Sequence, residues 1–159
     1  MITPLSFFRA QKHWLPVLLW MGLIFALSTR LGTAANTSRF IEPLLRWLVP
    51  DIDRATMDVI HGLVRKGAHM TEYAILALLT LRAVRISWRD RPRNGFYATA
   101  GIALAIAAAY AATDEFHQCF VPGRTPSLGD VLIDSGGAAA GLAVAALIRR
   151  FQLVRRPSE

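Results

Sequence analysis

The chain has 159 residues, which is enough for one domain and too few for two sizeable cores. Hydrophobic residues make up 53% of the chain and charged residues only 18%, an apolar balance for a soluble domain of this length. The formal charge of +7 does not indicate nucleic-acid binding, because the basic residues stand at the ends of apolar runs rather than on one basic face. The single cysteine, Cys119, excludes an intrachain disulfide and a cysteine metal knuckle.

Four apolar stretches approach the roughly 20 residues that a helix needs to cross the hydrocarbon core of a membrane. They cover about residues 13–29, 66–84, 96–113 and 128–148. The sequence therefore predicts an all-α integral membrane protein, in which residues 1–159 form one domain with a four-helix bundle. The first stretch follows basic residues and also has the form of a cleaved signal peptide, but three further spans favour an uncleaved first span.

Basic residues near the ends of the spans predict the orientation in the membrane. If the amino terminus is cytoplasmic, residues 1–13, 82–95 and the tail from Arg149 lie inside. These segments hold eleven Lys and Arg but only two acidic residues, Asp90 and Glu159. We therefore expect a multi-pass protein with both termini in the cytoplasm.

The segment between the first two spans contains apolar residues at helical spacing, namely Phe40, Ile41, Leu44, Leu45 and Leu48. It predicts an amphipathic helix over about 38–49 that lies at the outer interface, with Trp47 near headgroup level and Pro50 as a stop. Packing of this helix over the mouth of the bundle is the alternative. Its expected N-cap is Asn36, Thr37 or Ser38.

Asp53 or Thr56 is expected to cap a helix that runs without a break into the second span. On that span Lys66, His69 and Glu72 have i, i+3, i+6 spacing, which places them along one face of the helix.

The third and fourth spans carry the remaining polar groups. Asp114, His117 and Gln118 share a face at the end of the third span if the helix continues, and Asp130 and Asp134 are one turn apart near the start of the fourth. With the orientation above, groups from three helices arrive at one depth on the outer side. Charged side chains at membrane depth cost at least roughly 2.5–3.5 kcal/mol each, so we expect them to face the interior and to find partners.

These polar groups divide into two sets of candidates. The candidate catalytic residues are His69, Glu72, Asp114, His117 and Asp130. The candidate headgroup-binding residues are Lys66, Glu115, Gln118, Arg124, Ser127 and Asp134. For the His69 and Glu72 pair, a structural hydrogen bond, an acid–base pair and a metal site are all open, whereas Ser127 is favoured as a helix cap over a nucleophile. We predict no cofactor and no metal, because Lys66 and Arg124 would repel a cation bound by the nearby carboxylates.

Gly137 and Gly141 form a GxxxG motif on the fourth span. Small residues at this spacing let another helix approach closely. Packing within the chain is favoured over a homo-oligomer formed through these two glycines.

Three polar segments resemble the signature of the VanZ-like family. They are Arg65-Lys66-x-x-His69-x-x-Glu72-Tyr73, Asp114-Glu115-x-His117-Gln118-x-Phe120-x-x-x-Arg124 and Ser127-x-x-Asp130-x-x-x-Asp134-x-x-Gly137. A tryptophan in the first span followed by Ser28 also fits, and the resemblance covers about residues 14–148. It implies a small protein of the bacterial cytoplasmic (inner) membrane, in a family named for a protein linked to low-level teicoplanin resistance. The resemblance implies no reaction.

We expect an outward-facing polar pocket that binds a membrane lipid, a lipid-linked cell-wall precursor or an amphiphilic antibiotic such as a glycopeptide. The alternative is a membrane-embedded enzyme that acts on a lipid-linked substrate, with His69 or His117 as general base and a carboxylate as its partner. A proton-coupled transporter is disfavoured, because no charge lines the inner half of the spans.

Overall fold

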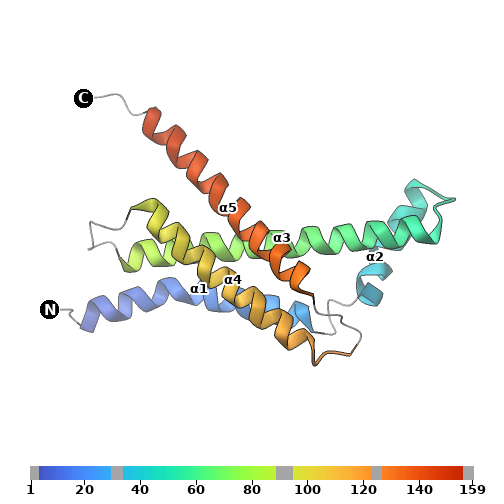
Figure 1. Ribbon diagram of the computed structural model, residues 1–159, viewed down its shortest axis with the longest axis horizontal. Coiled ribbons are helices and arrows are strands. Elements are labelled where there is room, and N and C mark those ends of the chain that lie inside the picture. Colours follow the sequence, from blue (N-terminus) through green and yellow to red (C-terminus); the bar gives the residue numbers. More distant parts are fainter. Residues whose placement is uncertain (1–3, 30–33, 89–94, 123–126, 156–159) are drawn as a thin grey trace.

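The computed structural model describes residues 4–29, 34–88, 95–122 and 127–155, and these ranges form helices and no strand (Figure 1). The helices are α1 (Pro4–Ser28), α2 (Ala34–Leu48), α3 (Arg54–Ser87), α4 (Phe96–Gln118) and α5 (Leu128–Val154). The prediction of an all-α fold is confirmed.

The long helix α3 is the centre of the fold, because it packs against each of the other four helices. Figure 1 shows α1 and α4 beside the half of α3 that ends at Ser87, α2 beside its first turns, and α5 crossing it obliquely. At 34 residues α3 is about 51 Å long, well over the thickness of the hydrocarbon core of a membrane.

Small side chains bring the helices close together. The core contains the fully buried alanines Ala77, Ala83, Ala103, Ala107, Ala111 and Ala138. In α5, a Cβ added at Gly137 would lie 2.6 Å from the Cα of Met70, and one added at Gly141 would lie 3.0 Å from the Cβ of Ala74. The GxxxG motif therefore packs on α3 within the chain, as favoured above.

Two of the described helices, α4 and α5, are long and apolar enough to cross a membrane, and α1 contains a shorter apolar segment, Lys12–Ser28. Large apolar side chains are exposed on α1 and α5, among them Leu18, Leu19, Leu147, Phe151 and Val154. An exposed apolar surface of this kind is unusual for a soluble monomer and suits contact with lipid.

The predicted spans lie, to within one residue, inside α1, α3, α4 and α5, but most of these helices extend further. A hydropathy pattern marks only the apolar part of a helix, whereas backbone hydrogen bonding continues through its polar ends. The predicted cap of the amphipathic helix was wrong, because α2 begins at Ala34 and Asn36, Thr37 and Ser38 lie inside it. The end of α2 at Leu48, two residues before Pro50, fits the predicted stop.

The cap of α3 is confirmed at Asp53. Its Oδ1 accepts a hydrogen bond of 2.9 Å from the backbone N–H of Thr56, and its Oδ2 accepts one of 2.7 Å from the Thr56 hydroxyl. The helix then runs without a break to Ser87, and the polar face of its middle turns meets α4 and α5.

Candidate binding cleft

A narrow cleft, which we call the acidic cleft, lies where three helices meet. Its lining comes from α3, α4 and α5 and consists of Arg65, Lys66, His69, Glu115, Gln118, Asp130, Ile133 and Asp134. Six of these residues are among those singled out from the sequence. Helical spacing on α3 and α5 brings one polar face of each helix toward the other, and the continuation of α4 to Gln118 adds the third wall.

The charged side chains of the cleft lie at different depths. Asp134 is only 1% exposed and forms the floor, whereas Lys66 is exposed and Arg65 is half-buried at the mouth. Neither cation forms an ion pair with a carboxylate in the described part of the chain. Two positive charges therefore lie at the mouth of the cleft, above a floor of carboxylates.

His69 faces the floor of the cleft. Its Nδ1 lies 3.8 Å from Oδ1 of Asp134, so a histidine from α3 and an aspartate from α5 form a close pair. The separation is longer than a hydrogen bond, so the contact between the two groups is electrostatic.

A second buried carboxylate lies outside the lining of the cleft, between α4 and α1. Asp114 is 2% exposed, and its Oδ2 accepts hydrogen bonds from the Ser28 hydroxyl at 2.7 Å and from Nε2 of Gln118 at 3.2 Å. Its Oδ1 has no hydrogen-bond partner among the described residues. Gln118 thus joins the buried Asp114 to the lining of the cleft.

Glu115 connects α4 to the start of α5. Its Oε2 accepts a 2.9 Å hydrogen bond from the backbone N–H of Ser127. The Ser127 hydroxyl in turn accepts a 3.0 Å bond from the N–H of Gly129 and caps α5, as the sequence predicted. This hydroxyl is therefore engaged in the cap.

Four of the predicted residues that the structure describes lie outside the lining, namely Asp114 and Ser127, placed above, and His117 and Glu72. The ring of His117 stacks against Phe25 of α1 with the ring centroids 4.3 Å apart, on a different side of α4 from Glu115. Glu72 does not line the cleft either, and its backbone carbonyl accepts a 2.9 Å hydrogen bond from the Trp20 indole. Arg124 lies outside the described residues.

A sequence model of the family described as VanZ/LLP1 matches residues 13–149, which is most of the chain and includes every residue of the cleft. The chain belongs to the VanZ/LLP1 family. Comparisons with curated proteins and with solved structures gave no match. Family membership and the two long apolar helices together indicate a membrane protein.

The size of the cleft limits what this VanZ/LLP1 protein can hold there. Its free volume of about 10 Å³ is close to the room needed for one water molecule. A phosphate group would therefore have to bind at the mouth, between the long basic side chains, unless the walls separate. Within the described ranges, no three His, Cys, Asp or Glu side chains are arranged to hold a metal ion.

Sequence reasoning gave no role to two residues in or near the site of this VanZ/LLP1 protein. Arg65 was part of the family motif but was not assigned a place in the pocket, although its position next to Lys66 was a usable signal. Ser28 is the partner of Asp114 across 86 positions of the chain. No spacing rule connects residues on helices that are so far apart in sequence.

Proposed function

We propose that this VanZ/LLP1 protein is a multi-pass protein of the bacterial cell envelope that binds the anionic headgroup of a lipid, a lipid-linked envelope precursor or an amphiphilic antibiotic at the outer mouth of the cleft. The observation that carries the proposal is the position of two cations, Arg65 and Lys66, above the carboxylates of the floor, with no ion pair to either cation among the described residues. Arginine can bind a phosphate through two parallel hydrogen bonds, and lysine adds a mobile point charge.

The carboxylates narrow the class of ligand. A ligand that offers only negative charge would be repelled by Glu115, Asp130 and Asp134. A ligand with an anionic group at the mouth and hydroxyl or amino groups just below it would match both charges of the cleft. Lipid headgroups with a sugar or glycerol beyond the phosphate have this chemistry, and glycopeptides carry amino and carboxyl groups together with sugars.

The placement in the membrane is supported by distances along α3. Lys66 and Arg85 are 19 residues apart, or about 28 Å along a helix, which is close to the thickness of the hydrocarbon core. The proposed spans are 13–29, 66–84, 96–113 and 128–148, in α1, α3, α4 and α5. With the basic ends of these helices in the cytoplasm, the cleft opens to the outer leaflet.

Helix α2 would then lie at the outer surface beside the first turns of α3. Trp47 is 77% exposed, and Leu44, Leu48 and Val49 are also exposed. An aromatic ring and aliphatic side chains on one short helix are typical of an element that rests among lipid headgroups. This helix would form a lip next to the mouth of the cleft.

Titration of the purified full-length protein with a polyprenyl phosphate tests the proposal. We expect the double substitution Arg65→Gln and Lys66→Gln to weaken binding by tenfold or more, because two charge-assisted contacts are lost. Arg54→Gln is the matched control, since Arg54 is an exposed cation on the same helix outside the cleft. The proposal fails if the control weakens binding as much as the double substitution. A parallel titration with teicoplanin separates a lipid carrier from an antibiotic as ligand.

A second function, a membrane-embedded enzyme, is favoured by one observation, the approach of His69 to Asp134. In such an enzyme Asp134 would orient the imidazole, and His69 would take a proton from a water molecule that attacks the terminal phosphorus of a polyprenyl diphosphate, so that the P–O bond breaks and polyprenyl phosphate and inorganic phosphate are released. His69→Gln should then abolish product formation from a polyprenyl diphosphate while leaving its affinity unchanged. His61→Gln, on the same helix outside the cleft, is the control. A binding protein would instead show no product in any variant.

A further inference from the structure

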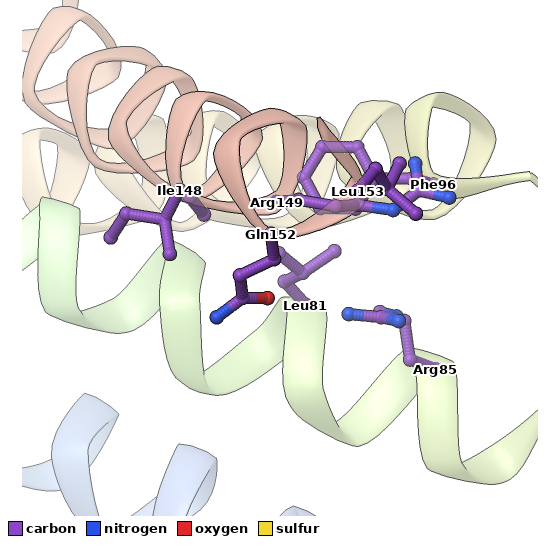
Figure 2. Close-up of a pocket in the computed structure, with 8 residues that line it drawn as sticks. Leu81, Arg85, Phe96, Ile148, Arg149, Gln152 and Leu153 are labelled. Carbon is purple, nitrogen blue, oxygen red and sulfur yellow. The ribbon is translucent and has the colours of Figure 1, made fainter. Parts of the chain in front are cut away.

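A second cleft lies at the opposite end of α3 from the acidic cleft, between α3, the start of α4 and the last turns of α5 (Figure 2). Its volume is about 380 Å³, within the range of sites that hold small molecules. Leu81, Ile148 and Leu153 supply apolar walls. This cleft plays no part in the function proposed above.

Two arginines meet in this cleft over one aromatic ring. The Cζ atom of Arg85 lies 5.8 Å and that of Arg149 lies 5.0 Å from the centroid of Phe96. Figure 2 shows Arg85 rising from α3 and Arg149 reaching across from α5, with Gln152 directed into the gap between the two helices. Phe96 itself is buried, so the ring is a fixed platform for both guanidinium groups.

Neither guanidinium is neutralised by another side chain within the described ranges. In the described part of the chain, no carboxylate forms an ion pair with Arg85 or Arg149. Two like charges held against the same ring repel each other, and an anion between them would remove this repulsion. The amide of Gln152 offers a further hydrogen-bond donor at the same place.

The surroundings indicate where the anion comes from. The side chains of α5 next to the cleft are large, apolar and exposed, including Leu147, Phe151 and Val154. A small soluble anion would make no contact with this apolar surface, whereas the acyl chains of a phospholipid would cover it. Basic pockets between spanning helices on the cytoplasmic side are a recognised way of binding anionic lipid headgroups.

We propose that this cleft binds an anionic phospholipid of the inner leaflet, with the phosphodiester between Arg85 and Arg149 and the acyl chains along the last turns of α5. The lipid fills the gap that α5 leaves as it diverges from α3 and joins the two helices at their cytoplasmic ends. The inference rests on the proposed placement of the protein in a membrane and not on the ligand of the acidic cleft.

Native mass spectrometry of the purified full-length protein in detergent, with phosphatidylglycerol or phosphatidylcholine added, tests this assignment. Phosphatidylglycerol should bind at least tenfold more tightly than phosphatidylcholine. Arg85→Gln and Arg149→Gln should each weaken phosphatidylglycerol binding by about tenfold, because each removes a charge-assisted contact. Arg149→Lys should lie between the wild type and Arg149→Gln, because it keeps the charge and loses the planar fork.

Arg150→Gln is the matched control, because Arg150 is the exposed neighbour of Arg149 and does not line the cleft. It should change binding by less than about threefold. Equal binding of the two lipids, an equal loss in Arg150→Gln, or displacement of phosphatidylglycerol by inorganic phosphate would each overturn the assignment. Because a glycerol headgroup also matches the chemistry proposed for the acidic cleft, Arg149→Gln should cause the same loss of phosphatidylglycerol binding in the background of Arg65→Gln and Lys66→Gln, which separates the two clefts.

Discussion

Replacing Gly137 with alanine tests the contact on which the acidic cleft depends. Gly137 lies three residues after Asp134, on the stretch of α5 that packs on α3. An added Cβ would lie 2.6 Å from the Cα and 2.8 Å from the carbonyl carbon of Met70. Since these are backbone atoms, α5 would have to move as a whole.

Gly136 is the matched control for this substitution. It precedes Gly137 on the same helix, and a Cβ added there meets no atom within 4 Å. Both substitutions gain the same helix propensity, about 1 kcal/mol for glycine to alanine, so this gain cancels in the comparison. What remains is the cost of overpacking, typically 1–3 kcal/mol, and a collision with backbone atoms belongs at the upper end.

Thermal unfolding in detergent, read by circular dichroism, measures the difference. We expect Gly136→Ala to be as stable as the wild type or more so, and Gly137→Ala to be less stable than Gly136→Ala by about 3 kcal/mol, or roughly 6–12 °C in Tm. Gly137→Ala should also weaken ligand binding at the acidic cleft, because Asp134 moves with α5. Equal stability of the two variants would refute the packing of α5 on α3 at this position.

Two further predictions concern buried and exposed carboxylates. Ser28→Ala removes a hydrogen-bond donor from the buried Asp114 and should lower the free energy of unfolding by about 1.5–3 kcal/mol. Ser135→Ala is the control and should change this free energy little, because the Ser135 hydroxyl makes no hydrogen bond within the described residues. Equal effects of the two substitutions would contradict the role of the bond. The hydrogen bonds from Thr56 lower the pKa of Asp53, so the stabilisation of the first turn of α3 is complete above the usual aspartate pKa and is lost as the pH falls through the lowered value. The backbone NMR chemical shifts of residues 54–57, which report helix, should follow this loss in the wild type. They should not do so in Asp53→Asn, because asparagine keeps a capping oxygen but has no titrating carboxyl group.

The two clefts give the proposed membrane protein different chemistry at its two ends. The acidic cleft is narrow, with carboxylates at its floor and cations at its mouth. The cleft beside Phe96 is larger and is lined by apolar and basic side chains. Both depend on the crossing of α5 over α3, which brings the helices together at Gly137 and Gly141 and lets α5 diverge from α3 toward its carboxyl-terminal end (Figure 1). A substitution at the crossing point is therefore expected to affect both sites.

Much of the architecture follows from local patterns in the sequence. Runs of about 20 apolar residues predict the helices, because only a helix satisfies its own backbone in lipid. The caps at Asp53 and Ser127 depend on side chains that bond to the backbone two or three residues away. The contact face of α5 is visible in the spacing of its two glycines. Each of these features is decided within a single helix.

The pairing of side chains between helices was decided only by the tertiary structure. Spacing places residues on a face of their own helix, but the rotation and crossing of the neighbouring helices determine what that face meets. This is why His69 faces Asp134, why Asp114 bonds to Ser28, and why His117 stacks on α1 outside the cleft. The approach of Arg85 and Arg149 to Phe96 was also decided by the tertiary structure. The three residues lie on three different helices, and local sequence patterns do not predict the relative positions of these helices.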